Sequence, residues 1–183
     1  MLLSFYDPSG VNKLIRKRDS QMIDLNFDLK TGKLIFDDLT LENVTEEYFF
    51  KSPLYQVLSE RNAVKSLMPH NYHIDSVFFL GKEFEVSIRP ISVASPFFVV
   101  CLVDKHSDYY KSLTDWYART NIEMLNESIK DLAEWFKEKL NLDEPEISEV
   151  EMIRWGFDWG RLSVSYETYS FFHGAYIVWD FGR

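Results

Sequence analysis

Apolar and polar residues alternate along residues 22–39, a pattern that predicts a β-hairpin. In "IDLNFDL" every second residue is apolar, "KTG" supplies a turn, and "KLIFDDL" returns. Such alternation is typical of strands that bury one face. The next stretch, "NVTEEYFFKSPLYQVLSE", has a candidate N-cap at Thr45 and is interrupted before Pro53, so we expect two short helices there.

A second hairpin is expected around Gly81 and Lys82, which suit a two-residue turn with glycine first. Pairing about this turn sets Phe79 opposite Phe84 and places the polar residues of the returning strand on the other face. Those polar residues are Glu83, Glu85, Ser87 and Arg89.

Residues 97–103, "FFVVCLV", form an unbroken apolar run, which predicts a central strand covered on both faces. We expect its cover to be a long helix from about Leu113 to Leu140, because apolar residues recur there at spacings of three and four. The residues of this stripe are Ala118, Ile122, Leu125, Ile129, Leu132, Phe136 and Leu140.

The C-terminal segment "WGFDWGRLSVSYETYSFFHGAYIVWDFG" is rich in Trp, Tyr and Gly, and it predicts a final hairpin. "RLSVSYE" alternates strictly, whereas "AYIVWDF" is apolar enough for an interior strand. Gly156 and Gly160 suggest a bend or a bulge. The loop between the strands offers Phe171, Phe172 and His173 as contact points for a partner.

Together these elements predict one α+β domain over residues 1–183. Its core is an antiparallel sheet built from hairpins, packed against one long helix (about 113–140) and shorter helices. A chain of 183 residues is near the usual size of one domain. We find no repeat, low-complexity tract or long linker that would divide it.

The charge of the chain narrows the class of partner. A net charge of −9 and a pI near 4.9 argue against a nucleic-acid-binding surface, and they serve either solubility, as in many cytoplasmic proteins, or attraction of a basic partner. No apolar run approaches the roughly 20 residues of a membrane helix, so a membrane is not an expected partner. The N-terminus lacks the order of a secretory signal, and the single cysteine, Cys101, fits a reducing compartment, so we expect a cytoplasmic protein.

Catalytic signatures are missing from the sequence. It has no nucleophile elbow, phosphate loop, dinucleotide fingerprint or HExxH motif, so neither an enzyme nor a cofactor is indicated. His70 and His73 are close in sequence, but a metal would need further ligands beside them, and we predict no metal site. Cys101 lies in an apolar run, where a thiol is expected to be inert.

Two clusters of carboxylates are the candidate binding residues. If they gather on one face, they would attract a basic partner and speed its association. The N-terminal acidic group is Asp37, Asp38, Glu42, Glu46 and Glu47. The C-terminal acidic group is Asp143, Glu144, Glu146, Glu149 and Glu151.

The layout of the chain resembles the immunity proteins encoded beside bacterial polymorphic or contact-dependent toxins. The resemblance lies in the hairpin "FDLKTGKLIFDDLTL", the following "KSPLY", one long helix and the terminal "WGRLSVSYETYSFFHGAYIVWD". It implies a non-catalytic cytoplasmic protein that binds and blocks a cognate toxin domain. If the toxin is a nuclease, its basic substrate-binding face suits an acidic inhibitor.

Two other functions remain open. One is an enzyme or small-ligand module with a pocket beside the C-terminal hairpin. Its ligand would stack on Trp155, Trp159 or Tyr166 and be oriented by Asp158 or Arg161. The other is a structural homo-oligomer, in which the terminal hairpin pairs with a second copy. The sequence leaves the oligomeric state undecided.

Overall fold

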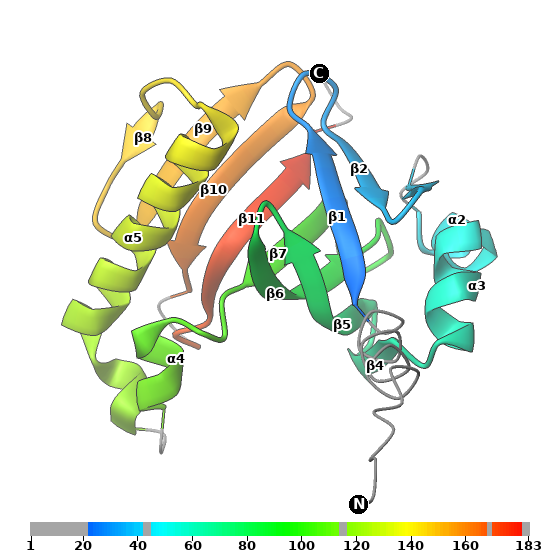
Figure 1. Ribbon diagram of the computed structural model, residues 1–183, viewed down its shortest axis with the longest axis horizontal. Helices are drawn as coiled ribbons and strands as arrows, with labels where there is room; N and C mark the ends of the chain where they lie inside the picture. The colour runs from blue at the N-terminus through cyan, green and yellow to red at the C-terminus, as the bar shows by residue number, and fades with distance from the viewer. Residues whose placement is uncertain (1–21, 42–44, 114–116, 168–169, 181–183) are drawn as a thin grey trace, which may run out of the picture.

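A computed structural model describes residues 22–41, 45–113, 117–167 and 170–180. Its main feature is one sheet of eleven strands (Figure 1). The strands are β1 (Ile23–Asp28), β2 (Lys33–Phe36), β3 (Leu39–Thr40), β4 (Val64–Met68), β5 (Asn71–Phe79), β6 (Lys82–Arg89), β7 (Phe98–Val103), β8 (Ile147–Ser148), β9 (Met152–Phe157), β10 (Gly160–Tyr166) and β11 (His173–Trp179). Their order is β3-β2-β1-β5-β6-β7-β11-β10-β9-β8, and β4 pairs with β5 beside this path.

The predicted α+β class is therefore correct, but the sheet is not wholly antiparallel. β1 and β5 pair in parallel, with Ile23 opposite Val77 and Leu25 opposite Phe79. The chain between them forms β2, β3, two helices and β4, and this long connection returns β5 to the end at which β1 began. A parallel pair requires a connection of that length, which a hairpin cannot provide.

The helices lie toward the two ends of the sheet (Figure 1). They are α2 (Glu46–Lys51), α3 (Pro53–Glu60), α4 (Asp108–Ser112), the 3-10 helix η1 (Tyr117–Thr120) and α5 (Ile122–Leu140). Thr45 caps α2 and Ser52 caps α3, so the prediction of two short helices is confirmed. Within the described residues, no helix is both long enough and apolar enough to cross a membrane.

The long helix starts later than we predicted. It was expected from about Leu113, but α5 begins at Ile122. The side chain of Asn121 accepts a hydrogen bond from the backbone N–H of Met124, which marks the first turn of α5. Because such a cap satisfies an amide that the helix leaves open, it sets a boundary that apolar spacing does not reveal.

The hairpin of β5 and β6 turns one residue earlier than predicted. Leu80 and Gly81 both have positive φ, at 50° and 91°, so they form the two-residue turn. Phe79 consequently pairs with Lys82, and Val77 pairs with Phe84. Each residue of β5 therefore pairs with a residue of β6 two positions earlier than predicted. Because a shift of two positions leaves side chains on the same face, the polar residues of β6 lie on the face that we predicted.

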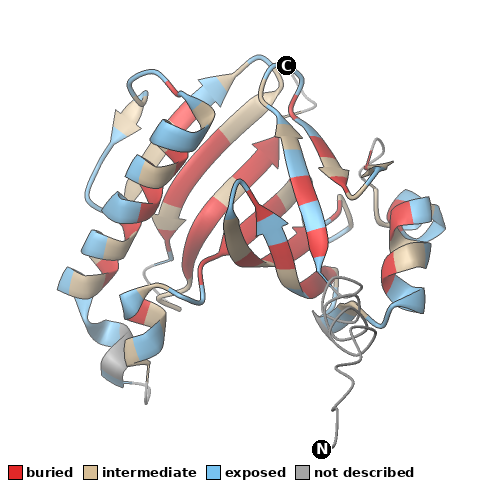
Figure 2. Cartoon of the chain, viewed as in Figure 1, coloured by how far each residue is buried: buried red, intermediate tan, exposed pale blue. Residues whose placement is uncertain are grey.

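The two faces of the sheet differ in what covers them. α5 contacts β9, β10 and β11, and Figure 2 colours residues of α5 and of these strands as buried. β7 and β11 both have strands on each side, as predicted for interior strands. The buried apolar residues form one cluster that reaches from β1 to β11. The opposite face bears the alternate residues of the same strands.

Indole groups tie the C-terminal hairpin to the first one. Trp159 donates from Nε1 to the carbonyl of Leu29 at 2.8 Å, and Trp179 donates to that of Gly32 at 2.9 Å. Gly32 has a φ of 71°, and a Cβ there would lie 2.4 Å from the Trp159 ring. A glycine is therefore needed at Gly32 for its conformation and for the space that Trp159 occupies.

Of the bend or bulge predicted at Gly156 and Gly160, the structure has a turn at residues 158–159 and no bulge. β9 and β10 pair without a register shift, with Gly156 opposite Arg161. Gly160 begins β10 with a φ of 151°, and a Cβ there would lie 2.1 Å from the carbonyl oxygen of Val178. Gly160 therefore serves a close backbone approach at a tight turn between β9 and β10.

Candidate functional site

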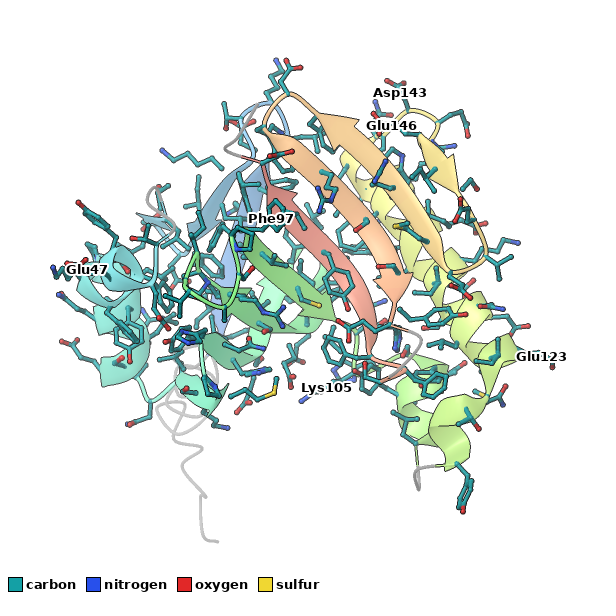
Figure 3. The ribbon with its side chains drawn as sticks, turned by 180° about the vertical axis from the view of Figure 1, so that it is seen from behind. Glu47, Phe97, Lys105, Glu123, Asp143 and Glu146 are labelled. Atoms are coloured by element: carbon teal, nitrogen blue, oxygen red, sulfur yellow. The ribbon has the colours of Figure 1, made fainter. Side chains whose placement is uncertain are left out.

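The two acidic groups lie at opposite ends of the molecule. In Figure 3, Asp143 and Glu146 are at the end that holds β8 and β9, whereas Glu47 is at the end that holds α2. All five members of the C-terminal acidic group are exposed. The two groups therefore do not form one electronegative face, and each has to be considered alone.

The N-terminal acidic group is largely engaged in local structure. Asp37 pairs with Arg61 at 2.8 Å, and Glu47 pairs with Lys51 at 2.6 Å. Glu46 accepts hydrogen bonds from Tyr72 and His70, and the Tyr72 bond is the main reason that its pKa lies below the usual value.

The other two members of the N-terminal acidic group are Asp38 and Glu42. Asp38 is exposed, and Glu42 lies outside the described residues. Carboxylates that already have partners have less to offer a ligand, so this group is the weaker candidate.

The tip of the C-terminal hairpin is less open than predicted. Phe171 and Phe172 are half-buried. His173 was expected at the tip, but it begins β11 and is only 1% exposed. Its Nε2 is 3.1 Å from the hydroxyl of Ser128, and its ring stacks on Tyr110. His173 belongs to the core, because α4 and α5 cover it.

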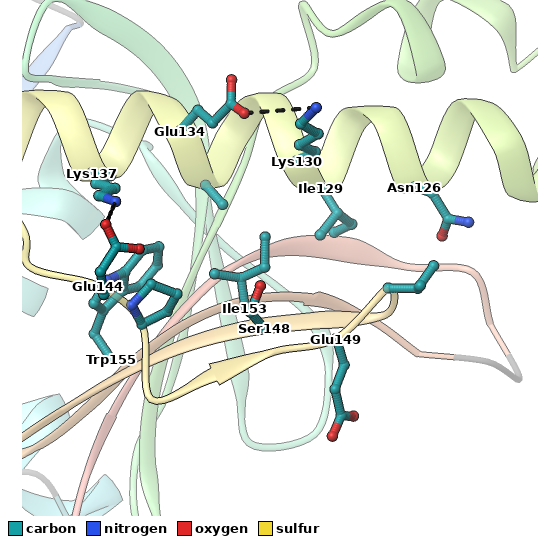
Figure 4. A pocket seen from close by; sticks show the side chains of 13 residues that line it. Asn126, Ile129, Lys130, Glu134, Lys137, Glu144, Ser148, Glu149, Ile153 and Trp155 are labelled. Carbon is teal, nitrogen blue, oxygen red and sulfur yellow. Dashed lines mark hydrogen bonds and ion pairs between the residues drawn. The ribbon is translucent and has the colours of Figure 1, made fainter.

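A groove between α5 and the strands β8 and β9 adjoins the C-terminal acidic group (Figure 4). Its volume is about 490 Å³, and we call it the edge groove. Ile129 of α5 and Ile153 of β9 point toward one another across it in Figure 4. The apolar side chains that line it are Ile129, Ala133, Pro145, Val150, Ile153 and Trp155.

Local backbone contacts hold the segment that forms the outer wall of the edge groove. α5 ends at Asn141, whose φ of 50° and ψ of 51° turn the chain back. The backbone N–H of Glu146 donates to the carbonyl of Arg154 at 2.8 Å. Trp155 donates from Nε1 to the carbonyl of Asp143 at 2.9 Å. These bonds keep the C-terminal acidic group in a fixed place around the groove.

Ion pairs leave the rim of the edge groove acidic. Lys137 pairs with Glu144 at 2.6 Å, and Lys130 is 3.9 Å from Glu134. Both lysines that line the groove are therefore matched by a carboxylate. Between residues 137 and 151 the chain has six carboxylates and two lysines. The surface around the groove is consequently negative.

The edge groove also contains an unsatisfied acceptor. The Oδ1 atom of Asn126, which lines the groove, is buried and has no hydrogen-bond partner within the described part of the chain. A buried polar atom without a partner costs about 1–3 kcal/mol. A donor from a binding partner would remove this cost.

One edge of the sheet lies beside the groove. β8 has only two residues and pairs with β9, so it is the last strand at this end. Val150, which follows β8, is 66% exposed. An open edge with an exposed apolar residue is a common feature of surfaces that bind proteins.

His70, His73 and Cys101 are the candidate metal-binding or nucleophilic residues in the part of the chain that the structure describes. No group of three or more His, Cys, Asp or Glu side chains there is placed to hold a metal. Burial raises the pKa of the Cys101 thiol to about 12, which keeps it protonated. His70 bonds to Glu46, whereas His73 lies within β5.

The stacking residues of the small-ligand alternative are engaged in packing. Trp155 and Tyr166 are buried, and Trp159 stacks on Phe157 with a centroid distance of 5.0 Å. Arg161 lies on the face away from α5, so it does not share a pocket with the buried rings of Trp155 and Tyr166.

We did not predict the edge groove from the sequence. The C-terminal acidic group was visible as a run of charges, but of the apolar residues that line the groove only Ile129 was predicted to lie on the apolar stripe of the long helix, and it was assigned to the core. Ala133 makes the apolar stripe of the helix wider. A stripe wider than the sheet can cover leaves one side of the helix open, so Ala133 was the residue in the sequence that could have indicated a groove.

Comparison with known proteins gives no match. No family model fits the chain, and neither a curated protein nor a solved structure is significantly similar to it.

Proposed function

We propose that this protein is a non-catalytic binding protein that captures a basic protein domain at its edge groove. The observation that carries the proposal is the apolar groove of about 490 Å³ surrounded by the exposed C-terminal acidic group. The apolar lining supplies area for burial, and the carboxylates supply attraction at a distance. A partner that inserts an apolar side chain and surrounds it with Lys or Arg matches both features.

The energetics favour a protein partner over a small molecule at this place. The carboxylates lie around the groove more than within it, and Glu149 points away from it in Figure 4. Charges at the rim of an interface change association rates, whereas the buried centre provides most of the affinity. The unpaired Oδ1 of Asn126 would accept a hydrogen bond from a Lys or Arg of the partner.

We propose an immunity role as the biological setting, with cytoplasmic location. Its support is the resemblance in layout together with the acidic surface, and a toxin blocked in this way needs no chemistry from the inhibitor. A nuclease toxin is the favoured partner, because its substrate-binding face must be basic. The described members of the N-terminal acidic group lie away from this surface, because they belong to α2 or adjoin β2 and β3 at the other end of the sheet, where Figure 3 labels Glu47.

The test begins with the product of the reading frame encoded beside this protein, whose toxicity should be suppressed by co-expression. Binding is then measured by surface plasmon resonance across salt concentrations. The variant Asp143→Lys with Glu149→Lys should lower the association rate at least about tenfold at low salt. Neither side chain has an ion pair in the described structure, so folding should be retained.

The matched control is Asp38→Lys with Glu60→Lys, which changes the net charge equally at the other end of the molecule. Both residues are exposed. If the two double variants bind alike, the edge groove is not the binding surface. If the neighbouring product neither binds nor becomes harmless, the immunity role is wrong. Association that does not weaken as salt rises would contradict the charge argument.

A further inference from the structure

The face of the sheet turned away from α5 contains a second and larger hollow. Figure 3 looks onto this face, with α5 behind the strands. The hollow has a volume of about 820 Å³ and is lined by side chains from β4 to β7 and from β9 to β11. We call it the sheet-face cleft. Its size falls within the range of roughly 300–1,000 Å³ that is usual for small-molecule sites.

Strand register places one row of polar side chains across the floor of this cleft. Ser163 pairs with Tyr176, Tyr176 with Cys101, Cys101 with Ser87, and Ser87 with His73. Paired residues on adjacent strands point to the same face. Residues far apart in sequence therefore meet in a single line that crosses β10, β11, β7, β6 and β5.

A second row of the register has an arginine at each end. Arg161 pairs with Val178, Val178 with Val99, and Val99 with Arg89. Since neighbouring strands are about 4.8 Å apart, the two arginine backbones stand roughly 14 Å from one another. The two valines between them provide an apolar strip on which the body of a ligand can lie.

The guanidinium groups make the sheet-face cleft positive in a chain of net charge −9. Arg89, Arg154 and Arg161 line it, together with one carboxylate, that of Glu167. The guanidinium group of Arg89 has no hydrogen bond or ion pair within the described ranges, and only the backbone of Arg89 pairs, with Val99 of β7. Arg161 lies over the Phe97 ring at 5.9 Å from its centroid, and Nε of Arg154 is 4.0 Å from Glu146. These arginines are available to an anion.

Two buried polar groups in the sheet-face cleft lack a hydrogen bond to nitrogen or oxygen in the described structure. His73 is 8% exposed, and within the described residues neither ring nitrogen has a hydrogen bond. The closest carboxylate oxygen, Oε1 of Glu85, is 3.7 Å from its Nδ1, and the other oxygen of Glu85 pairs with Lys105. The hydroxyl of Tyr176 is likewise buried without a nitrogen or oxygen partner in the described structure, and the neighbouring Cys101 thiol offers it only a weak hydrogen bond.

Buried polar groups without a protein partner are rare in folded proteins, and groups of this kind can bond a ligand that enters the cleft. His73 lies at one end of the polar row, and Tyr176 lies near its centre. Both have atoms that line the sheet-face cleft. A neutral imidazole both donates and accepts, as does a phenol, so together they suit a ligand with hydroxyl or carbonyl groups.

We propose that the sheet-face cleft binds a small organic oxyanion. Its carboxylate or phosphate pairs with the guanidinium group of Arg89 or Arg161, and its body lies over Val99 and Val178. His73 and Tyr176 bond to its uncharged polar groups. Phe97, which is 41% exposed, provides an aromatic side wall. The site does not depend on the edge groove, because it uses the other face of β9 and β10.

Isothermal titration calorimetry on the full chain tests this site with phenyl phosphate, benzoate, inorganic phosphate and neutral benzyl alcohol. The organic anions should bind and benzyl alcohol should not, because the arginines recognise charge. Inorganic phosphate should bind at least tenfold more weakly than phenyl phosphate. Equal binding of the two would contradict a role for the apolar strip.

The arginines are tested with the double variant Arg89→Gln and Arg161→Gln, which should lower the affinity for the organic anions at least tenfold. The matched control is Arg61→Gln, since Arg61 pairs with Asp37 and does not line the cleft. The proposal is overturned if both proteins bind alike, or if no organic anion binds at about 10 mM. Binding of an acidic peptide without binding of the small anions would overturn it in favour of a protein segment.

Tyr176→Phe separates a binding role from a structural role. If the hydroxyl of Tyr176 stabilises the fold, its removal should lower the melting temperature. A hydroxyl reserved for a ligand should leave the melting temperature equal or higher, while the affinity for the organic anions falls. A lower melting temperature with unchanged affinity would contradict the role that we assign to Tyr176.

Discussion

The edge groove and the sheet-face cleft differ in charge and in how the chain builds them. The edge groove is bordered by five carboxylates that lie within nine residues of sequence, from Asp143 to Glu151. The sheet-face cleft has arginines from β9 and β10, which form one hairpin, and from β6, which is far from that hairpin along the chain. One molecule thus has an acidic surface, to which we assign a protein partner, and a basic hollow, to which we assign a small anion.

The difference shows what kinds of site a sequence reveals. A charged surface made by one segment is visible as a run of residues, because neighbours in sequence stay neighbours in space. A cleft made by register has no local signature. Each of its strands has ordinary polar residues on alternate positions, which by themselves indicate only a face exposed to solvent.

The largest expected effect is on the free energy of unfolding, from a substitution in the packed core that supports both the edge groove and the sheet-face cleft. Trp179 is 7% exposed, packs on Phe98 at 4.7 Å between ring centroids, and bonds to the first hairpin. We expect Trp179→Ala to lower the free energy of unfolding by about 3–5 kcal/mol. Urea denaturation measures this, and Val93→Ala, a change at a fully exposed residue, is the control. Both sites should weaken together in the Trp179 variant.

The effect of pH distinguishes His173, which is buried in the core, from His73, which lines the sheet-face cleft. Burial lowers the pKa of His173 to about 4, from a usual value near 6.5. The unfolded chain therefore takes up a proton first, so stability is complete above pH 6.5 and falls as the pH drops toward 4. A shift of this size is worth about 3 kcal/mol.

The variant His173→Gln should flatten the pH dependence of stability between pH 6.5 and 4, as measured by urea denaturation. His73 supplies the comparison, because burial also lowers its pKa but its ring faces the cleft. An organic anion beside His73 should raise that pKa, which NMR titration can follow. The pKa of His173 should not move, and an equal change in both histidines would contradict a local site.

A smaller effect is expected at the edge groove. Asn126→Leu removes the buried Oδ1 that lacks a partner in the described structure. We expect the free energy of unfolding to rise by up to about 1 kcal/mol, because the unsatisfied group is gone. Binding of the partner should weaken at the same time. A loss of stability in thermal denaturation would show instead that Asn126 supports the fold.

The smallest effect on stability is expected from the charge reversal at the edge groove. Exposed substitutions such as Asp143→Lys and Glu149→Lys usually change stability by about 0.5 kcal/mol or less. This variant should bind organic anions as the unchanged protein does, and the arginine double variant should bind the protein partner normally. Calorimetry and plasmon resonance on both variants measure the separation. Loss of both activities in either variant would show that the two sites are coupled.

Much of the fold could be predicted because the signals are local. The first hairpin, the helices after Thr45 and Ser52, the interior strand at Phe98–Val103 and the final hairpin each follow from a pattern of a few residues. The parallel pairing of β1 with β5 could not be predicted. It depends on where a connection of several elements returns, and no short pattern encodes this.

The candidate sites divide in the same way. The five residues of the C-terminal acidic group are each exposed, whereas His173, predicted at the exposed tip of the hairpin, is buried because α4 and α5 cover it. The contacts of α4 and α5 with the start of β11 join residues that are far apart in sequence. Hydrophobic spacing in the strand does not show which residues such a helix will reach.

By itself, the sequence determined the class of fold, most of its strands and helices, and the acidic character of one end. Those properties arise from interactions between near neighbours along the chain. Only the tertiary structure decided that Arg89, His73, Tyr176 and Arg161 lie on one face around one hollow. Their meeting requires the pairing of β5, β6, β7, β11 and β10 in a fixed register, and register is set by the packing of the whole core.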